Sequence, residues 1–214
     1  FPSLIFIGDS HMAQYYLRAQ RLSEREHVNF GMIAKAGWFL FNDQRMGDYA
    51  RAVKAIVADK RVHTLVIGSM WGEIKEEEFY QVAATVRPLL ETRKDLKVYV
   101  MLDYPWTPNV GGQQGIYDPL KHVNRITGDA VGMVQPFPAA DDWKRGNEEI
   151  QRILGDAAEY IDPTPIVCPG QKCNLQAWYR DDDHLQPKRI EADGIWVDRI
   201  FEHAAAAESK ERSR

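Results

Sequence analysis

Two short segments near opposite ends of this 214-residue chain carry side chains that could perform chemistry together. The first reads Gly-Asp-Ser-His over residues 8–11 and follows an apolar run, and the second contains Asp181 and His184 with two residues between them. A lone serine hydroxyl is a weak nucleophile, and it needs a base that a third group holds in place. Ser10, His184 and a carboxylate could fill these three roles.

Each of these residues also has a plainer interpretation. Ser10 could merely cap a helix, because serine and aspartate are favoured N-caps, and His184 could be a surface histidine in an acidic loop. His11 adjoins Ser10, but successive residues of a helix point in different directions, so we expect His11 to shape the pocket rather than act as the base. His122 is the second choice for the base.

Five apolar runs alternate with helical patterns along the chain. We expect strands over residues 3–8, 28–34, 64–68, 97–103 and 159–161, and helices over residues 11–22, 45–58, 76–92, 142–158 and 187–207. This alternation predicts an α/β fold, a flavodoxin-like three-layer α/β/α sandwich around a mostly parallel five-stranded sheet. In such sheets ligands bind beyond the carboxyl ends of the strands, which is where Ser10 would follow the first strand.

Composition is typical of a globular domain. The chain is 44% hydrophobic and 27% charged, with a net charge of −4 and no basic stripe, so a nucleic-acid partner is not expected. It has no apolar stretch long enough to span a bilayer, no Gly-x-Gly-x-x-Gly motif and no phosphate-binding loop, and we expect no cofactor. We predict a single domain over residues 1–207 and a frayed, charged tail over residues 208–214. Because the chain opens directly on the first strand, we interpret it as a domain excised from a longer protein.

The chain contains only two cysteines, Cys168 and Cys173. A local disulfide between them would suit an oxidising compartment, and the alternatives are two free thiols or half of a metal site. No second pair of cysteine or histidine residues has ligand-like spacing, which argues against zinc, and we expect no metal ion.

Taken together, Gly-Asp-Ser at residues 8–10 and the Asp-x-x-His at residues 181–184 resemble the motifs of the SGNH/GDSL hydrolase superfamily. Three features are similar to one branch of it: Gly-Asp-Ser-His, the cysteine pair at residues 168–173, and the Asp-Asp-Asp-His-Leu at residues 181–185. That branch comprises the periplasmic SGNH domains fused to acyltransferase-3 membrane proteins, which O-acetylate bacterial glycans. Since the motifs lie at both ends, the resemblance spans nearly the whole chain.

The resemblance implies a role for each residue of the triad. Ser10 would be the nucleophile and His184 the general base. Asp181 would orient His184, rather than its neighbours Asp182 and Asp183, because in this family the carboxylate three residues before the histidine shares its loop. The same resemblance favours a disulfide between the two cysteines.

The resemblance also implies an oxyanion hole, and here the sequence departs from the family pattern. SGNH enzymes usually use the backbone N–H of the serine, the backbone N–H of a glycine after the second strand, and an asparagine side chain after the third. Ser10 and Gly37 can fill the first two roles, but residues 68–73 read Gly-Ser-Met-Trp-Gly-Glu, without asparagine. Losing one donor typically costs about two to three orders of magnitude in rate. The acyltransferase-3-linked branch often carries tryptophan here.

Aromatic residues gather where the carboxyl edge of the sheet is expected. They are Trp38, Phe39, Trp71, Tyr104, Trp106 and Trp178. Aromatic rings can stack on sugar faces while their polar atoms bind hydroxyls, although ordinary packing is the alternative for any single ring. We expect Trp71 and Trp106, together with His11, to contact the substrate.

The family resemblance implies an O-acetyltransferase domain that moves an acetyl group, through a serine acyl-enzyme, to a hydroxyl of a cell-envelope polysaccharide such as lipopolysaccharide O-antigen. The acetyl donor, acetyl-CoA, would be used by an integral membrane acyltransferase domain of the same parent chain, N-terminal to this segment. The domain would then be the periplasmic part of an inner-membrane protein. One alternative is a glycan O-acetylesterase or GDSL esterase, with water as the acceptor. The other is a non-catalytic glycan-binding module, which the missing asparagine suggests.

Overall fold

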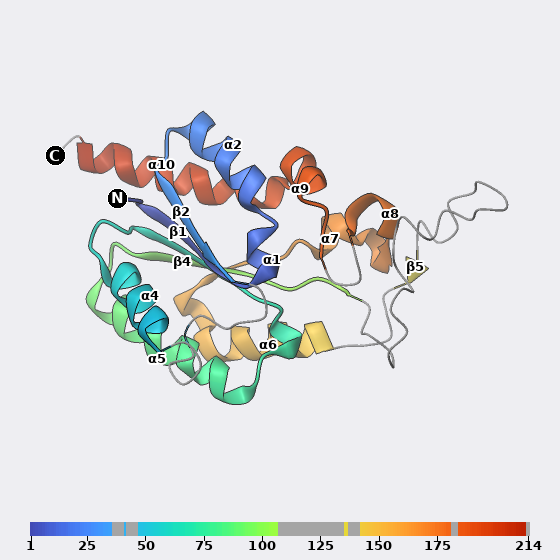
Figure 1. Ribbon diagram of the computed structural model, residues 1–214, viewed down its shortest axis with the longest axis horizontal. Coiled ribbons are helices and arrows are strands. Elements are labelled where there is room, and N and C mark those ends of the chain that lie inside the picture. Colours follow the sequence, from blue (N-terminus) through green and yellow to red (C-terminus); the bar gives the residue numbers. More distant parts are fainter. Residues whose placement is uncertain (36–40, 42–46, 107–134, 137–141, 181–183, 213–214) are drawn as a thin grey trace.

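Five short apolar segments pair as parallel strands at the centre of the computed structural model (Figure 1). They are β1 (Leu4–Gly8), β2 (Phe30–Ala34), β3 (Thr64–Gly68), β4 (Lys97–Met101) and β6 (Glu159–Ile161), in the order β2-β1-β3-β4-β6. The structure describes residues 1–35, 41, 47–106, 135–136, 142–180 and 184–212. The all-parallel order and the helices on both faces confirm the predicted flavodoxin-like α/β fold. A small antiparallel pair, β5 (Gln135–Pro136) and β7 (Lys172–Cys173), lies apart from this sheet.

The two central strands read as continuous apolar runs because helices cover them on both faces. Every residue of β1 and β3 is buried. Side chains alternate between faces along a strand, so Leu4 and Phe6 join one hydrophobic cluster while Ile5 and Ile7 join the other. Each of these strands therefore contributes to two cores.

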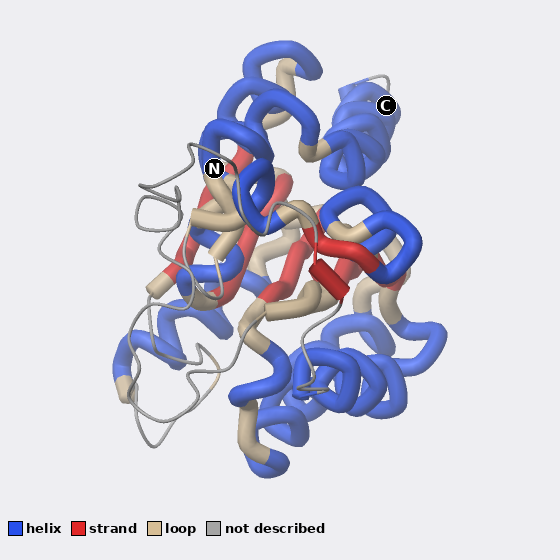
Figure 2. The backbone as a smooth tube through the Cα atoms, turned by 90° about the vertical axis from the view of Figure 1, so that its right-hand side faces the viewer, coloured by secondary structure: helices blue, strands red, loops and turns tan. Residues whose placement is uncertain are grey.

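Two helical layers enclose the sheet (Figure 2). One face carries α1 (Ser10–Ala13), α2 (Tyr16–Glu26), α9 (Pro187–Asp193) and α10 (Asp198–Arg212), and the other carries α4 (Asp48–Ala58), α5 (Glu76–Thr92) and α6 (Asp142–Leu154). The short helices α7 (Thr164–Val167) and α8 (Leu175–Trp178) lie beyond the carboxyl ends of the strands, on the side away from both termini (Figure 1). None of the helices in the described ranges combines the length and the apolar character that a bilayer crossing demands.

Two of the predicted helices are divided in the structure. The helix expected over residues 11–22 breaks between α1 and α2, where the N–H groups of Gln14 and Tyr15 bond back to Ser10 O and Met12 O. The helix expected over residues 187–207 divides into α9, the 3₁₀ turn η4 (Ile195–Val197) and α10. Gly194 ends α9 by donating its N–H to Ile190 O.

Residues 208–212 of the predicted tail are helical in the structure, because α10 continues to Arg212. Glu208 accepts hydrogen bonds from Ser3 Oγ and from the backbone N–H of Asn29. These contacts tie the end of the helix to the amino ends of β1 and β2, which a reading of the tail as small and charged could not anticipate.

The first glycine of the Gly-Asp-Ser segment is required by a close approach of backbones. Gly8 ends β1 opposite Gly68 of β3, and α1 begins two residues later. A Cβ atom on Gly8 would lie 1.9 Å from Gly68 O and 2.6 Å from Met12 Cβ. The glycine thus lets the chain leave the strand and start a helix against its neighbour.

We predict that Gly8→Ala lowers the free energy of unfolding by about 3 kcal/mol, because a backbone oxygen cannot move aside without displacing β3. The midpoint of denaturant unfolding measures this loss. Gly31→Ala on β2 is a matched control, since its new Cβ would meet only side chains, the nearest being Pro2 Cγ at 3.0 Å. Equal stability of the two variants would show that the approach of α1 to β3 is not the constraint.

Candidate active site

Ser10 lies at the carboxyl edge of the sheet, where the strand order reverses between β1 and β3. It is the first residue of α1 and is partly exposed. Within the described part of the chain, its backbone N–H is not engaged in a hydrogen bond. Position and exposure are those a nucleophile and its oxyanion donor require.

Asp9 locks the backbone around Ser10. One carboxylate oxygen accepts the N–H of His11 at 2.9 Å, and the other accepts Ser69 Oγ at 2.7 Å and the N–H of Met70 at 2.9 Å. Asp9 therefore caps α1 and joins it to the segment after β3. The N-cap role that the sequence left open for Ser10 belongs to Asp9, which leaves the Ser10 hydroxyl available for chemistry.

His184 is held at the same edge by backbone pairing. Tyr179 and Leu185 form an isolated antiparallel bridge, and the N–H of Arg180 donates to His184 O at 2.8 Å. The N–H of Leu185 donates to Gln14 Oε1 at 2.7 Å, which connects this loop to the end of α1. The loop is thereby anchored on both sides of its histidine.

The structure brings His184 next to the Gly-Asp-Ser-His segment. The rings of His184 and His11 lie 5.1 Å apart, centroid to centroid, at an interplanar angle of 62°. Because His11 follows Ser10 directly in the chain, the two sequence motifs lie at the same edge of the sheet. Asp181, Asp182, Asp183 and Gly37 lie outside the described residues, so their predicted roles stay predictions.

His11 is buried, and it faces a carboxylate that the sequence analysis missed. Its Nδ1 lies 3.2 Å from Oδ1 of Asp103, whose side chain is fully buried just after β4. Burial raises the pKa of Asp103, and the nearby His11 imidazole acts to lower it. Asp103 is the last residue of the strand predicted over residues 97–103, and this was the available signal, because the strand's carboxyl end had to reach the same edge as Ser10.

Three buried tyrosines surround this cluster and are neutral hydrogen-bonding groups. Burial raises the pKa values of Tyr15, Tyr104 and Tyr179 well above the ordinary range of a phenol. Tyr104 stacks on His11 with the ring centroids 5.5 Å apart, and its hydroxyl contacts the amide of Gln14. The three tyrosines therefore add no charge to the site, where the ionisable groups beside them are carboxylates and imidazoles.

Trp71 and Trp106, predicted to stack on a sugar, are instead core residues. Trp71 is 0% exposed, stacks on Phe79 and donates Nε1–H to Met101 O at 2.7 Å. Trp106 is 4% exposed and donates Nε1–H to Asp103 Oδ2 at 3.2 Å. A ring without an exposed face cannot stack on a sugar, so the burial argues against that role for both residues.

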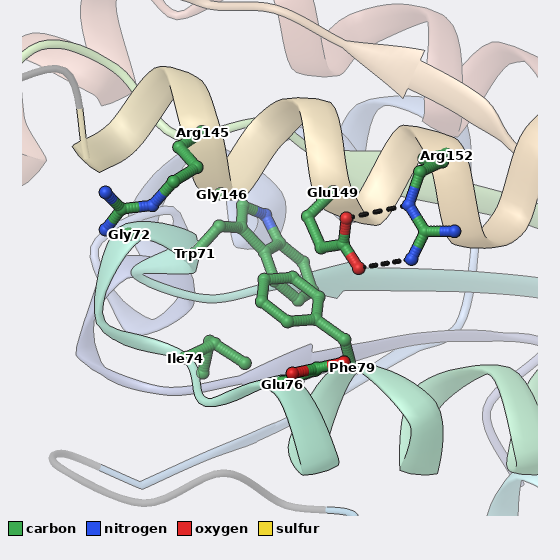
Figure 3. A pocket seen from close by; sticks show the side chains of 9 residues that line it. All are labelled: Trp71, Gly72, Ile74, Glu76, Phe79, Arg145, Gly146, Glu149 and Arg152. Atoms are coloured by element: carbon green, nitrogen blue, oxygen red, sulfur yellow. Dashed lines mark hydrogen bonds and ion pairs between the residues drawn. The ribbon is translucent and has the colours of Figure 1, made fainter.

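A cavity lies beside Trp71, on the face of the sheet that α5 and α6 cover (Figure 3). Its volume is about 450 Å³ and its lining consists of Trp71, Gly72, Ile74, Glu76, Phe79, Arg145, Gly146, Glu149 and Arg152. The rings of Trp71 and Phe79 stack against each other, and Glu149 and Arg152 pair along α6. Because Trp71 packs in one hydrophobic cluster and Leu185, the neighbour of His184, in the other, this cavity does not include the serine–histidine site.

Two donors in the described segment after β3 do not replace the missing asparagine of the oxyanion hole. Ser69 Oγ and Met70 N–H both donate to Asp9. The amide of Asn147 lies close by, but it bonds both the N–H and the C=O of Asp103, at 2.7 and 2.9 Å. Of the two groups predicted for the oxyanion hole, the Ser10 N–H lies in the described residues and Gly37 does not.

The two cysteines form a disulfide, as the resemblance led us to expect. Cys168 Sγ lies 3.5 Å from the hydroxyl of Tyr179, which donates a hydrogen bond to Pro105 O. Since Tyr179 begins the loop that carries His184, the disulfide contacts the start of this loop and supports it. No three histidine, cysteine or acidic side chains of the described ranges gather as metal ligands.

One family model matches this chain, and several solved structures share its fold. The family model described as the SGNH domain fused to AT3 domains matches residues 1–188. The periplasmic domain of a lipopolysaccharide acetyltransferase from Salmonella ser. Paratyphi A superposes with a TM-score of 0.66 at 11% identity, covering 95% of this chain and 84% of that one. A candidate SGNH hydrolase from Slackia heliotrinireducens gives 0.57 at 16% identity, covering 97% and 96%.

A member of the lipolytic G-D-S-L family from Veillonella parvula superposes with a TM-score of 0.51 at 14% identity, covering 95% of both chains. The search of curated proteins finds no match. At these identities the solved structures establish the fold, and the family model establishes the family.

Proposed function

This chain belongs to the family of SGNH domains that are fused to AT3 domains, and on that premise we propose that it is a serine-dependent O-acetyltransferase domain. Ser10 would accept an acetyl group and pass it to a hydroxyl of a cell-envelope polysaccharide. The observation that carries the proposal is the meeting of the two sequence motifs: Ser10 begins α1, and the His184 ring contacts that of its neighbour His11.

In the first half-reaction, His184 takes the hydroxyl proton as Ser10 Oγ attacks the acetyl carbonyl. The backbone N–H of Ser10 stabilises the oxyanion, and we assign Gly37 as a second donor on the sequence motif alone. The tetrahedral intermediate expels the leaving group, which takes the proton from His184, and acetyl-Ser10 remains.

In the second half-reaction, His184 removes the proton from a sugar hydroxyl, whose oxygen attacks acetyl-Ser10. The proton returns to Ser10 Oγ as the acetylated sugar leaves, so the enzyme is regenerated. Asp181 would keep the His184 imidazole in the required tautomer, again on the motif. The acetyl group would come from acetyl-CoA by way of the fused AT3 domain.

Two features support the transferase over other readings of the same residues. The Salmonella match is the periplasmic domain of a lipopolysaccharide acetyltransferase, which suggests a cell-envelope glycan as acceptor and the periplasm as the location. The disulfide suits that oxidising compartment. The second candidate is an esterase that uses water as acceptor, which the hydrolase-type neighbours suggest.

Competition between acceptors separates the two candidates. The domain is given para-nitrophenyl acetate with and without a cell-envelope oligosaccharide, and both free acetate and acetylated sugar are quantified. We expect acetylated sugar to exceed free acetate when the oligosaccharide is present, with neither product formed by Ser10→Ala above the spontaneous rate. Serine-dependent acetate release that is unchanged by the oligosaccharide would favour the esterase.

A further inference from the structure

A second histidine–aspartate pair lies directly behind the proposed base. His11 is 4% exposed, and its Nδ1 faces Asp103 Oδ1 at 3.2 Å. The proposed reaction uses neither side chain, since Ser10 supplies the nucleophile and His184 the base. Burying two ionisable groups costs free energy unless they pair with each other, so we expect this pair to have a function.

Asp103 is a rigid anchor. Its Oδ1 also accepts the N–H of Tyr104 at 3.1 Å, and its Oδ2 accepts Trp106 Nε1–H at 3.2 Å. The Asn147 amide clamps the Asp103 backbone from α6. With the backbone and both carboxylate oxygens engaged, Asp103 fixes whatever it binds.

The His11 ring is consequently held on several sides. Asp103 binds its Nδ1, Tyr104 stacks on one face almost in parallel, at 9°, and its own backbone N–H is held by Asp9. This immobilised ring is what the His184 ring packs against, 5.1 Å away and tilted by 62°. The His184 ring lies on a loop, and it packs against the His11 ring, which is fixed in the core.

Charge gives the contact a second consequence. A fully buried carboxylate and an adjacent imidazole share one proton most cheaply, either as an ion pair or as two neutral groups, and either arrangement has no net charge. While the pair is intact, His184 takes up a proton beside a neutral unit. Replacing the His11 ring by a neutral amide that still donates to Asp103 Oδ1 removes the positive charge from beside this carboxylate, and negative charge on Asp103 then favours a proton on His184.

We propose that His11 is a positioning residue for His184: together with Asp103 it fixes the plane of the His184 ring and sets the charge against which that ring is protonated. The proposal rests on the proposed function only in taking His184 as the base.

The other ionisable groups around the pair do not duplicate this effect. Asp9, at the start of α1, is engaged by three hydrogen-bond donors. Tyr15 from the α1–α2 junction, Tyr104 from the segment after β4 and Tyr179 from the end of α8 are buried, neutral phenols. Residues 181–183, the three aspartates beside His184, lie outside the described part of the chain and are unchanged in every variant below.

The test is an NMR titration of the His184 imidazole in ¹⁵N-histidine-labelled protein, beside the pH dependence of Ser10-dependent ester hydrolysis. The variant is His11→Asn, because an asparagine amide can replace Nδ1–H toward Asp103 while removing the ring and its charge. We expect the His184 midpoint to rise by on the order of one pH unit. We expect kcat to fall by up to about 10²-fold with KM little changed, because the base is misplaced.

The double variant His11→Asn/Asp103→Asn should bring the midpoint back toward the wild-type value, since no buried carboxylate remains. The matched control is His63→Gln, which breaks a similar pair, Nδ1 to Asp95 Oδ2 at 3.3 Å, at the amino end of β3. It should leave the His184 titration unchanged. Should His11→Asn fail to fold, Asp103→Asn alone is compared with the wild type, and a His184 titration and a kcat like those of the wild type would contradict the proposal.

An unchanged or lowered His184 midpoint in folded His11→Asn would overturn the proposal. Its failure is distinguishable from that of the proposed function, because the NMR titration needs no turnover. If wild-type Ser10 does not react with an activated ester, the acyl-transfer assignment fails while the titration still reports on His11 and Asp103.

Discussion

Ser10→Ala is expected to abolish covalent labelling by a fluorophosphonate probe and to lower hydrolysis of para-nitrophenyl acetate by about 10³-fold or more. The substitution removes the only atom of the site proposed to bond the acyl group. It leaves the backbone in place, because the cap of α1 comes from Asp9 and not from the Ser10 hydroxyl. The loss therefore falls on chemistry and not on folding.

The matched control is Ser23→Ala near the end of α2, where the hydroxyl donates to Val28 O at 2.7 Å. This variant should keep both labelling and hydrolysis, with a small loss of stability. Labelling of Ser10→Ala at the wild-type level would mean that the probe reacts elsewhere and that Ser10 is not the nucleophile.

His184→Gln is expected to lower the same hydrolysis rate by about 10²- to 10⁴-fold, the usual contribution of general acid–base catalysis. In the wild type the rate should rise with pH as the imidazole loses its proton and becomes able to accept the one on Ser10. That rising limb should be absent from the variant, whose residual rate comes from the backbone donor and from binding.

His63→Gln serves as the control here too, because His63 lies just before β3, at the opposite edge of the sheet from Ser10. It should keep the full rate and the rising limb. If His184→Gln retained the pH dependence of the wild type, the base would be another group, and His11 would be the first to examine because its ring is the neighbour of His184.

The sheet and its site edge could be predicted because they depend on local pattern. The β-branched and apolar runs at residues 4–8 and 64–68 are buried on both faces, so they stand out in the sequence and form strands at nearly the predicted bounds. The break at Gln14 could not be predicted, since it depends on contacts with Tyr104 and Leu185 from distant parts of the chain.

Within the site, motif spacing predicts Ser10 and His184 as nucleophile and base, but it could not say which side chains would lie beside them. Asp103 reaches His11 only because β4 ends at the same edge as β1, and aromatic composition cannot distinguish a buried ring from an exposed one. The sequence therefore predicts substrate contact for Trp71 and Trp106, whereas their N–H groups bond the end of β4 and the residue that anchors His11.

The most direct test of the account is peptide mass mapping of the domain after brief exposure to para-nitrophenyl acetate and an acid quench. We expect one acetyl group on the peptide that contains Ser10, absent from Ser10→Ala and lost to the sugar when an acceptor oligosaccharide is added before the quench. Wild-type protein that turns over the ester while Ser10 never carries the acetyl group would contradict it.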